Sequence, residues 1–557
     1  MGNIKNDDQG LFQFQNRPYY PLILIVCLLL VFTVRFNYAK YLPLSGDEVG
    51  VGVLQSVGKW SLYKNTLPCN EKVDVFTIKK YLEYSNEYSS NDVLSTMRSD
   101  RLHPPLYFIL LHFVIKYFGT TVAVLRMLSI IFSVFSVITF YYLGKVLYND
   151  SVGLISALLM SLSAYCLEYS VMVRMYPLAM WLALLSTLLA VILVKRDAFH
   201  FRSILLYIYI FISVAGLYTY YSFAVLIASQ FVFVLLSNKK DLKALTNIFF
   251  AYFLIIILLI PWILTMIEGV HYVHTKNYYF TGSYTLLFLL QYFFETIFIP
   301  FKSQLFSFSP IFVNLGISLL SLFILFIYLV GVFKSAYSRT IISFLFSVFI
   351  YFLILVVSDK LLYTKTMVFD RQHYFAIPVL LLLLASGVVH LSKNMYVKRT
   401  IIFLLTIVFV SGLIYRYHNK SVFDGPYYFQ QLTQQLNNYS LNTTDKENLI
   451  LYNAKDKRYL LPFIHNTSRN FDLMIIPEGI NDSILKRIGH IEKYRNIFLV
   501  NINVPAIKRE RLKLQNIDLN IVSLYLSSNG FINDTTPYIY NYVETLTINF
   551  FINHRRV

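Results

Sequence analysis

The chain has 557 residues, of which 57% are hydrophobic and 14% are charged, and its mean hydropathy is +0.56. Soluble domains typically carry about 25% charged residues, so this composition excludes a soluble protein and indicates an integral membrane protein. The formal net charge of +18 fits the Lys and Arg that gather on cytoplasmic loops, and no nucleic-acid-binding module accompanies it, so nucleic acid is not an expected partner.

The apolar segments predict an α-helical polytopic bundle. They are roughly 18 or more residues long and number about 11 to 13, whereas the strands of an outer-membrane barrel would alternate over about 10 residues. The first segment, Tyr20–Tyr38, lacks a small-residue cleavage site, so we expect an uncleaved span after a cytoplasmic tail of residues 1–19. The bundle is expected to occupy residues 20–415.

A long polar loop, residues 41–103, follows the first segment. It opens with the adjacent carboxylates Asp47 and Glu48. Val49–Trp60 has apolar residues at helical spacing, and Thr77–Tyr88 is rich in Tyr and Lys, which suits helices that lie on a membrane surface.

Basic clusters between later apolar segments predict the orientation of the bundle. We place four of them on the cytoplasmic side: Lys195–Arg202, Lys239–Lys243, Lys334–Arg339 and Lys393–Arg399. The apolar segments around them are 175–194, 203–219, 221–237, 246–267, 310–333, 340–357, 374–391 and 400–415.

This alternation predicts which connections face the external side: Glu168–Arg174, Tyr218–Tyr221, Glu268–Pro310, Ser358–Arg371 and the C-terminal region. Leu286–Pro300 then becomes an interfacial or re-entrant helix. Between residues 104 and 174, one segment must fail to span fully, and the sequence does not say which.

The C-terminal residues 416–557 are more polar and are expected to form a small external α/β domain, with capping of the membrane site as its expected role. Expected strands are Asn448–Tyr452, Phe471–Ile476 and Ile497–Val504, and expected helices are Pro426–Leu436 and Ile484–Tyr494.

Charged and aromatic residues gather in four segments on the predicted external side. The candidate site residues are Asp47, Glu48, Arg101, His103, Glu168, Arg174, Tyr176, Arg371, His373 and Tyr374. Acids that remove a proton, together with Arg and His that bind a phosphate, suit chemistry on a phosphorylated lipid.

Structural alternatives stand beside each of these assignments. Asp47 and Glu48 are also typical of a solvated loop start, and His103 of a residue that precedes a Pro-led helix. Arg126 is more simply a snorkelling anchor, and Tyr218–Tyr221 an aromatic belt.

The order of the motifs resembles the C-type-fold glycosyltransferases that use polyprenyl-phosphate sugars, in the branch of protein O-mannosyltransferases and aminoarabinose transferases. In that family an Asp-Glu pair opens the first external loop, as Asp47-Glu48 does here, and a His-Pro-Pro-Leu-Tyr motif closes it, as His103–Tyr107 does here. A later Arg-x-Tyr-x-Leu tract is matched by Arg174–Leu178. The resemblance covers about the first 400 residues.

The resemblance implies that an acceptor hydroxyl attacks the anomeric carbon, with inversion, while a lipid phosphate leaves. It implies Asp47 as the base, Glu48 as an orienting group, and Arg174 and Arg371 as donors to the phosphate. Met172 stands where many relatives have a second acid that helps to hold a metal ion, so the resemblance does not assign a cofactor here and a divalent metal stays open.

The expected partners are a polyprenyl-phosphate-linked sugar donor, a lipid, glycan or protein acceptor, and the bilayer, with a bacterial inner membrane as the expected location and an external active site. Two other classes stay open, namely a transporter or flippase of lipid-linked glycans and a noncatalytic scaffold. A transporter usually carries ionisable residues near mid-membrane, whereas the acids here stand at segment ends.

Overall fold

A computed structural model describes residues 19–237, 242–275, 322–333, 339–361, 374–418, 433–434, 436–438, 440, 443–453, 460–476, 487, 489–503, 526–528, 531–533, 540–542 and 544–553. Within these residues, six helices are long and apolar enough to cross a membrane: α1 (Tyr19–Tyr41), α7 (Val122–Leu147), α10 (Tyr176–Lys195), α13 (Leu242–Thr275), α18 (Ile377–Leu391) and α19 (Met395–His418). The predicted polytopic helical bundle is confirmed.

Further apolar helices are shorter or broken. The pair α8 (Asp150–Leu162) and α9 (Ala164–Ser170) is bent by 66° and counts as a seventh span if taken together. The shorter ones are α6 (Leu106–Phe118), α11 (Ile204–Leu217), α12 (Phe223–Ser237), Leu322–Phe333 and Ile342–Ser358 of α17 (Arg339–Leu361).

The chain divides into two compact units, which are described separately. The helical unit comprises Met1–Lys40, Met97–Leu110 and Arg126–His418. The sheet unit comprises Tyr41–Thr96, Leu111–Leu125 and Asn419–Val557, so most of the first polar loop belongs to the same unit as the C-terminal region.

In the helical unit, α7 runs antiparallel to α1. Arg126 at the start of α7 donates to the carbonyl of Ala39 at the end of α1 (3.0 Å), and at the opposite ends Tyr20 and Ser151 share a hydrogen bond of 3.1 Å. Arg126 is 0% exposed, so its interpretation as a snorkelling anchor was wrong: the guanidinium instead satisfies a helix carbonyl that has no partner within the helix.

The end of α10 that carries Lys195 lies beside the end of α7, because the Lys195 ammonium donates to the carbonyl of Val146. Helix α6 has 13 residues, fewer than the about 20 that a crossing needs, whereas α8 and α9 together are long and apolar enough to cross. The chain therefore reaches the Lys195 end through α7 and leaves it through α8 and α9. Arg174 then lies at the opposite end of the helical unit from Lys195.

The break between α8 and α9 is stabilised by polar groups. Ser163 accepts from the Cys166 amide at 3.3 Å and caps α9. Arg35, which is 1% exposed, donates to the carbonyls of Met160 and Ser161 at the end of α8 (3.4 and 3.3 Å). A cation at a helix C-terminus satisfies free carbonyls and the helix dipole together.

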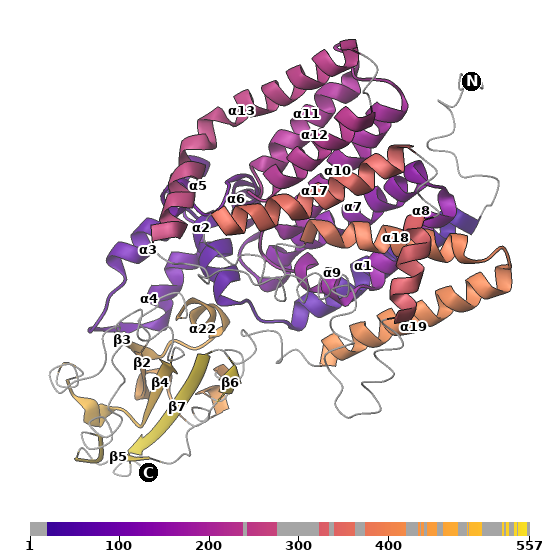
Figure 1. Ribbon diagram of the computed structural model, residues 1–557. Helices are drawn as coiled ribbons and strands as arrows, with labels where there is room; N and C mark the ends of the chain where they lie inside the picture. Colours follow the sequence, from indigo (N-terminus) through magenta and orange to yellow (C-terminus); the bar gives the residue numbers. More distant parts are fainter. Residues whose placement is uncertain are drawn as a thin grey trace. The chain divides into compact units, whose positions relative to one another are not determined.

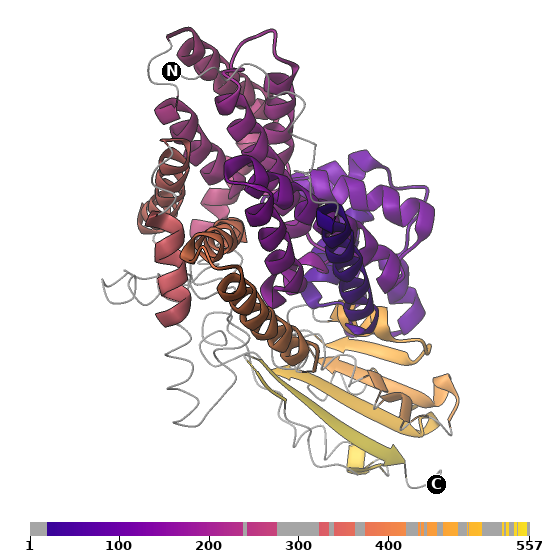
Figure 2. The same ribbon diagram turned by 90° about the vertical axis from the view of Figure 1, so that its right-hand side faces the viewer.

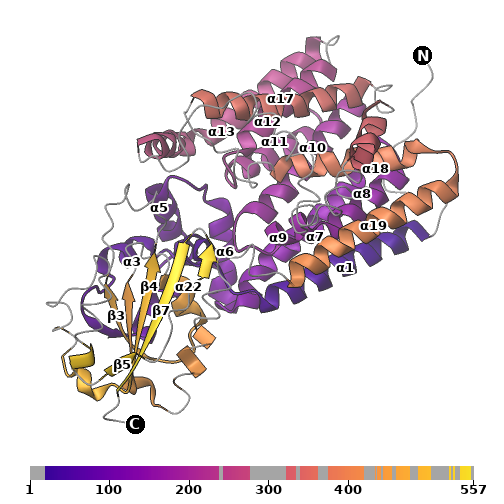
Figure 3. The same cartoon turned by 60° about the horizontal axis from the view of Figure 1, so that its bottom comes forward.

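The remaining helices of this unit pack through apolar faces and a few internal hydrogen bonds. Helix α11 packs on α10 and α13, and α12 packs on α17 (Figure 1). Gln230 of α12 donates to Ser186 and Thr187 of α10 (3.0 and 2.9 Å) and accepts from Tyr209 of α11 (3.1 Å), so these polar side chains are paired within apolar surroundings. Helices α1 and α19 lie side by side (Figure 3), with the rings of Tyr38 and Tyr417 6.0 Å apart.

The sheet unit is built on a seven-stranded mixed sheet of order β1-β3-β2-β4-β7-β5, with β6 also paired to β7. The orange and yellow strands of Figure 2 belong to this sheet. Its strands are β1 (Lys72–Asp74), β2 (Asn448–Asn453), β3 (Asp472–Ile476), β4 (Asn496–Asn503), β5 (Phe531–Asn533), β6 (Tyr540–Tyr542) and β7 (Glu544–Asn553). The pairs β2–β3 and β2–β4 are parallel and the other pairs are antiparallel. The central strands are continuous apolar runs because both faces of such strands are buried.

Short helices complete the sheet unit. They are η1 (Glu48–Val53), α2 (Leu54–Ser56), α3 (Trp60–Thr66), α4 (Val75–Lys79), η2 (Lys80–Leu82), η6 (Asp445–Glu447), α22 (Leu460–Asn466) and η8 (Ile491–Lys493); α5 (Ser90–Asp100) begins in this unit. Helix α22 covers one face of the sheet, where Phe463 stacks on Tyr452 of β2 at 5.8 Å.

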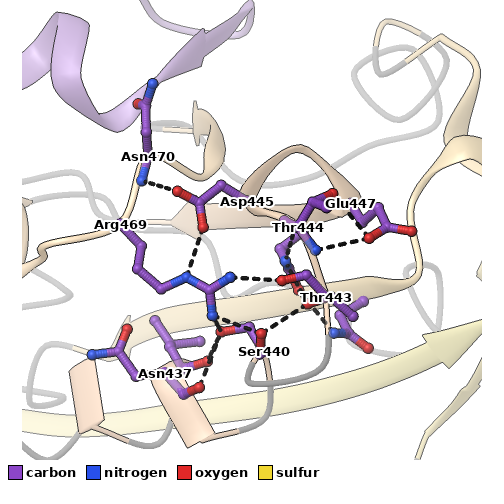
Figure 4. A network of polar contacts seen from close by, with 11 residues as sticks. Asn437, Ser440, Thr443, Thr444, Asp445, Glu447, Arg469 and Asn470 are labelled. Carbon is purple, nitrogen blue, oxygen red and sulfur yellow. Dashed lines mark hydrogen bonds and ion pairs between the residues drawn. The ribbon is translucent and has the colours of Figure 1, made fainter.

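A polar network joins the turn before β2 to the turn before β3 (Figure 4). Asp445 accepts from Arg469 Nε (2.6 Å) and from the Asn470 amide (2.9 Å), and Arg469 donates further to the carbonyls of Ser440 (2.6 Å) and Thr443 (2.8 Å). Beside it, Asp472 at the start of β3 is also surrounded by donors. These charge-assisted bonds stabilise the starts of the parallel strands.

The predicted C-terminal strands at 448–452, 471–476 and 497–504 are confirmed by β2, β3 and β4. The predicted helix Val49–Trp60 is present as η1 and α2, whereas Thr77–Tyr88 is helical only in its first part. Most of Pro426–Leu436, part of Ile484–Tyr494, and all of Leu286–Pro300 lie outside the described residues; where Ile484–Tyr494 is described, only η8 is helical.

Candidate active site

The segment from Asp100 to Leu106 joins α5 to α6 and carries the His-Pro-Pro motif. Helix α5 ends at Asp100 because Arg101 adopts a left-handed conformation with φ of +64°. The prolines at 104 and 105 then prevent a helix from continuing and favour the start of α6 at Leu106.

Three side chains of the helical unit form a continuous polar chain. The Asp100 Oδ2 atom lies 2.7 Å from His103 Nδ1, and His103 Nε2 lies 3.0 Å from Arg174 Nη2. Because a guanidinium only donates, Nε2 accepts, so His103 carries its proton on Nδ1 and donates it to Asp100. Arg174 is 4% exposed, so the chain orients a buried guanidinium.

A second set of hydrogen bonds links the His-Pro-Pro-Leu-Tyr motif to the tract before Arg174. Ser129 of α7 donates to the carbonyl of Met172 (2.6 Å), and the Tyr107 hydroxyl lies 3.2 Å from the Ser129 hydroxyl. Both Tyr107 and Ser129 are 0% exposed. A buried polar group that loses its hydrogen bond is costly, because no water replaces the partner. These bonds therefore fix the position of the His-Pro-Pro-Leu-Tyr motif relative to the tract before Arg174.

A cluster of aromatic rings begins beside the Arg174 guanidinium. Arg174 lies 5.9 Å from the ring centre of Tyr176, and the Tyr176 ring lies 6.1 Å from that of Tyr374 and 5.4 Å from that of Tyr169. A ring face attracts a cation, and the attraction grows where water is excluded. Of the predicted site residues, Tyr176 therefore lies beside Arg174, and Tyr374 lies beside Tyr176.

Two other predicted site residues of the helical unit have partners of their own. Glu168 lies 3.5 Å from Arg416 of α19, with its side chain 26% exposed. Arg101 lies 3.1 Å from Glu268 of α13, and both side chains are exposed. His103 is thus bonded directly to Arg174, whereas the contacts of Arg101 and Glu168 described here are with α13 and α19.

Asp47 and Glu48 belong to the sheet unit and differ in environment. Glu48 is 3% exposed, and its carboxylate accepts from the Ser45 amide at 2.8 Å while its own amide donates to the Ser45 hydroxyl at 3.2 Å. This reciprocal pair is a capping box at the start of η1. Asp47 is exposed at the same helix start. Glu48 therefore has a local structural function, whereas the Asp47 side chain is exposed.

Arg371 and His373 lie outside the described residues. Asp100 was not among the predicted site residues. Its spacing of three residues from His103 would have predicted a contact between the two side chains at a helix end. Among the described residues, no group of three or more His, Cys, Asp or Glu side chains is placed to hold a metal ion.

Comparisons with known proteins agree with this arrangement of motifs. Residues 102–264, which contain His103, Arg174 and Tyr176, match the model of the family described as dolichyl-phosphate-mannose-protein mannosyltransferase. A search of curated proteins found no match.

Solved structures of low identity were also found. They include ArnT from Cupriavidus metallidurans bound to undecaprenyl phosphate (10% identity, 96% of this chain and 98% of that chain, TM-score 0.49) and the Archaeoglobus fulgidus oligosaccharyltransferase in the apo form (10%, 86% and 70%, 0.46). A third is the oligosaccharyltransferase AglB from Archaeoglobus fulgidus in complex with an inhibitory peptide and a dolichol-phosphate (11%, 97% and 74%, 0.47).

The sequence match falls on the motifs that carry the predicted resemblance, and no comparison points to a flippase. The predicted resemblance is confirmed over residues 102–264, where the chain is similar to the family described as dolichyl-phosphate-mannose-protein mannosyltransferase.

Proposed function

We propose that the chain transfers a sugar from a polyprenyl-phosphate donor to an external lipid, glycan or protein acceptor, with inversion at the anomeric carbon. The observation that carries this proposal is the Asp100–His103–Arg174 chain, because it fixes the orientation of the buried Arg174 guanidinium. Arg174 lies in the segment that matches the family model. Arg is suited to phosphate by its fixed fork of donors.

Charge develops on the phosphate as the reaction proceeds. The bond between the anomeric carbon and the phosphate oxygen breaks, and its electron pair leaves with the polyprenyl phosphate. Arg174 stabilises this extra charge, and His103 keeps the guanidinium oriented, so no reorganisation is needed at the moment of transfer. Tyr176 supports the cation through its ring.

The acceptor hydroxyl forms the new glycosidic bond and loses its proton to a carboxylate. Asp47 is the proposed base on its position in the sequence pattern, and its exposure is consistent with that function. Glu48 supports the helix start that carries Asp47, through the bonds with Ser45. The sequence pattern supports further proposed substrate-binding residues, namely Arg101, Glu168, Arg371, His373 and Tyr374.

The proposed location is a bacterial inner membrane with the reaction on its external side. Lys195 belongs to a basic cluster, and Arg174 lies at the opposite end of the helical unit. Because basic clusters favour the cytoplasmic side, this arrangement supports an external position for Arg174.

Reconstitution with a radiolabelled polyprenyl-phosphate sugar tests the proposal. Mass spectrometry of lipid that co-purifies with the protein identifies the carrier to use. The expected result is equal release of free polyprenyl phosphate and formation of a new glycosidic bond, with the opposite anomeric configuration by NMR. Movement of intact labelled lipid across the bilayer, with no new bond, would contradict it.

A further inference from the structure

The turn at Arg101 lies between two members of the polar chain, Asp100 and His103. Its φ of +64° is in the left-handed region, which costs a non-glycine residue about 1 kcal/mol or more. Such a conformation persists only where the surroundings hold it. The Arg101 turn therefore needs contacts that stabilise it.

A hydroxyl from the α11–α12 connection provides the first contact. Tyr221 donates to the Arg101 carbonyl at 3.3 Å and accepts from the indole nitrogen of Trp262, in α13, at 3.1 Å. Burial and the charge of Asp100 outweigh the hydrogen bond from Trp262 and raise the pKa of Tyr221 to about 12. The hydroxyl therefore keeps its proton and remains a donor.

The second contact is a close backbone approach by α13. A Cβ at Gly269 would lie 2.2 Å from the Arg101 carbonyl oxygen, so only glycine fits without a shift of one segment. The neighbouring ion pair of Glu268 with Arg101 has side chains 58% and 44% exposed, and exposed pairs contribute little. The fit at Gly269 and the hydroxyl of Tyr221 thus hold the turn.

The other end of the segment is tied to the same connection. The Leu106 amide donates to the Tyr218 carbonyl at 2.9 Å, and the Tyr218 ring lies 6.3 Å from that of Trp262. The α11–α12 connection, braced by Trp262, therefore fixes both ends of the His-Pro-Pro segment.

We propose that Tyr221, Trp262 and Gly269 are positioning residues for sugar transfer, which act through the Arg101 turn on the Asp100–His103–Arg174 chain. This inference rests on the proposed function of that chain. A turn that relaxes would rotate Asp100 away from His103 Nδ1 and remove the bond that selects its tautomer. Arg174 would then lose its oriented acceptor, so transition-state stabilisation would suffer more than donor binding.

The test is a double-mutant cycle on the full-length reconstituted protein. Tyr221→Phe removes one hydroxyl and leaves the ring in place. We expect kcat for sugar transfer to fall about fivefold to tenfold, which corresponds to one net hydrogen bond, with the donor KM within about twofold. In a His103→Gln background, Tyr221→Phe should cause no further loss, because the chain through which it acts is already broken.

Tyr218→Phe is the matched control. Its hydroxyl donates to the Leu258 carbonyl at 3.1 Å, so the variant changes the same connection but leaves the Arg101 contact intact. We expect its kcat to stay close to that of the wild type. Gly269→Ala is the second test variant and should lower kcat in the same non-additive way.

The outcomes separate this inference from the proposed function. If His103→Gln transfers sugar at the wild-type rate, the proposed function of the polar chain fails. If His103→Gln is impaired but Tyr221→Phe has no effect, or has the same effect in both backgrounds, only the positioning role is overturned. A Tyr221→Phe variant whose thermal stability falls and whose KM rises as kcat falls would also overturn it, as a structural defect.

Discussion

His103 Nε2 lies 3.0 Å from Arg174 Nη2, although 71 residues separate the two in the chain. An imidazole nitrogen that accepts from a guanidinium cannot carry a proton, so the bond defines both the His103 tautomer and the direction of the Arg174 side chain. This relationship connects the His-Pro-Pro motif with the Arg-Met-Tyr motif. It gives the two motifs a shared function in place of two separate ones.

Replacement of Arg174 by Lys should lower kcat by about 10²-fold, the loss typical of one donor to a developing anion. An ammonium keeps the charge but not the planar fork that reaches both His103 and a phosphate oxygen. The measurement is single-turnover sugar transfer with saturating donor. An Arg174→Lys enzyme with wild-type kcat would show that the guanidinium geometry is not used.

Replacement of Asp100 by Asn should lower kcat by about tenfold or more. The amide can donate to His103 Nδ1, which would move the ring proton to Nε2 and remove the acceptor for Arg174. NMR of 15N-labelled histidine reports the tautomer directly, alongside the transfer rate. Unchanged tautomer together with unchanged rate would contradict the assigned function of Asp100.

Substitutions at Glu48 should separate stability from chemistry. Glu48→Ala removes the bond to the Ser45 amide, so the free energy of unfolding should fall by about 0.5–2 kcal/mol. Glu48→Gln retains an acceptor and should be close to the wild type in stability. Thermal unfolding in detergent measures both. A Glu48→Gln variant as unstable as Glu48→Ala would show that charge, and not the capping box, is what matters.

Stability of the sheet unit should fall in acid. Burial acts to raise the pKa of Asp472, but hydrogen bonds from Tyr494 and Lys446 and the charges of Lys446 and Lys493 outweigh it and lower the pKa overall. A lowered folded-state pKa contributes stability above the unfolded-state value of about 3.9, and the contribution is lost as the pH falls through the folded-state value.

The measurement for Asp472 is unfolding of wild type and Asp472→Asn across pH 7 to pH 3. We expect Asp472→Asn to be less stable by about 1–3 kcal/mol at neutral pH, and the difference to shrink in acid. A constant difference across this range would mean that the carboxylate charge contributes nothing to stability. Thr467→Ala, which removes a hydroxyl that donates to the Phe463 carbonyl (2.8 Å) in the same unit, serves as a control with no expected pH dependence.

The elements that the sequence predicts well are those with strong local patterns. Strands β2, β3 and β4 are continuous apolar runs, and the long helices are apolar over at least 18 residues. Strand β1 could not be predicted, because three residues, Lys72–Asp74, have no periodicity and gain their strand from pairing with β3, far along the chain. The crossing order between residues 104 and 174 could not be predicted either, because it depends on how the short helix α6 is arranged with its neighbours.

The candidate site divides in the same way. His103, Arg174 and Tyr176 could be predicted from motifs, but Tyr221 could not, since its importance lies in a contact with Arg101, a residue distant in sequence. The function of Glu48 could have been predicted from the sequence, because Ser45 and Glu48 have the spacing of a capping box. This spacing would have assigned the structural function to Glu48 and left Asp47 as the candidate base.

The most direct test of the central claim is single-turnover sugar transfer by Asp47→Asn beside wild-type protein in the same membrane. Asp47→Gln and Glu48→Gln serve as controls for side-chain size and for position. The account predicts that Asp47→Asn inserts, folds and binds donor like the wild type but forms no new glycosidic bond, while Glu48→Gln retains transfer. Wild-type turnover by Asp47→Asn would contradict the account.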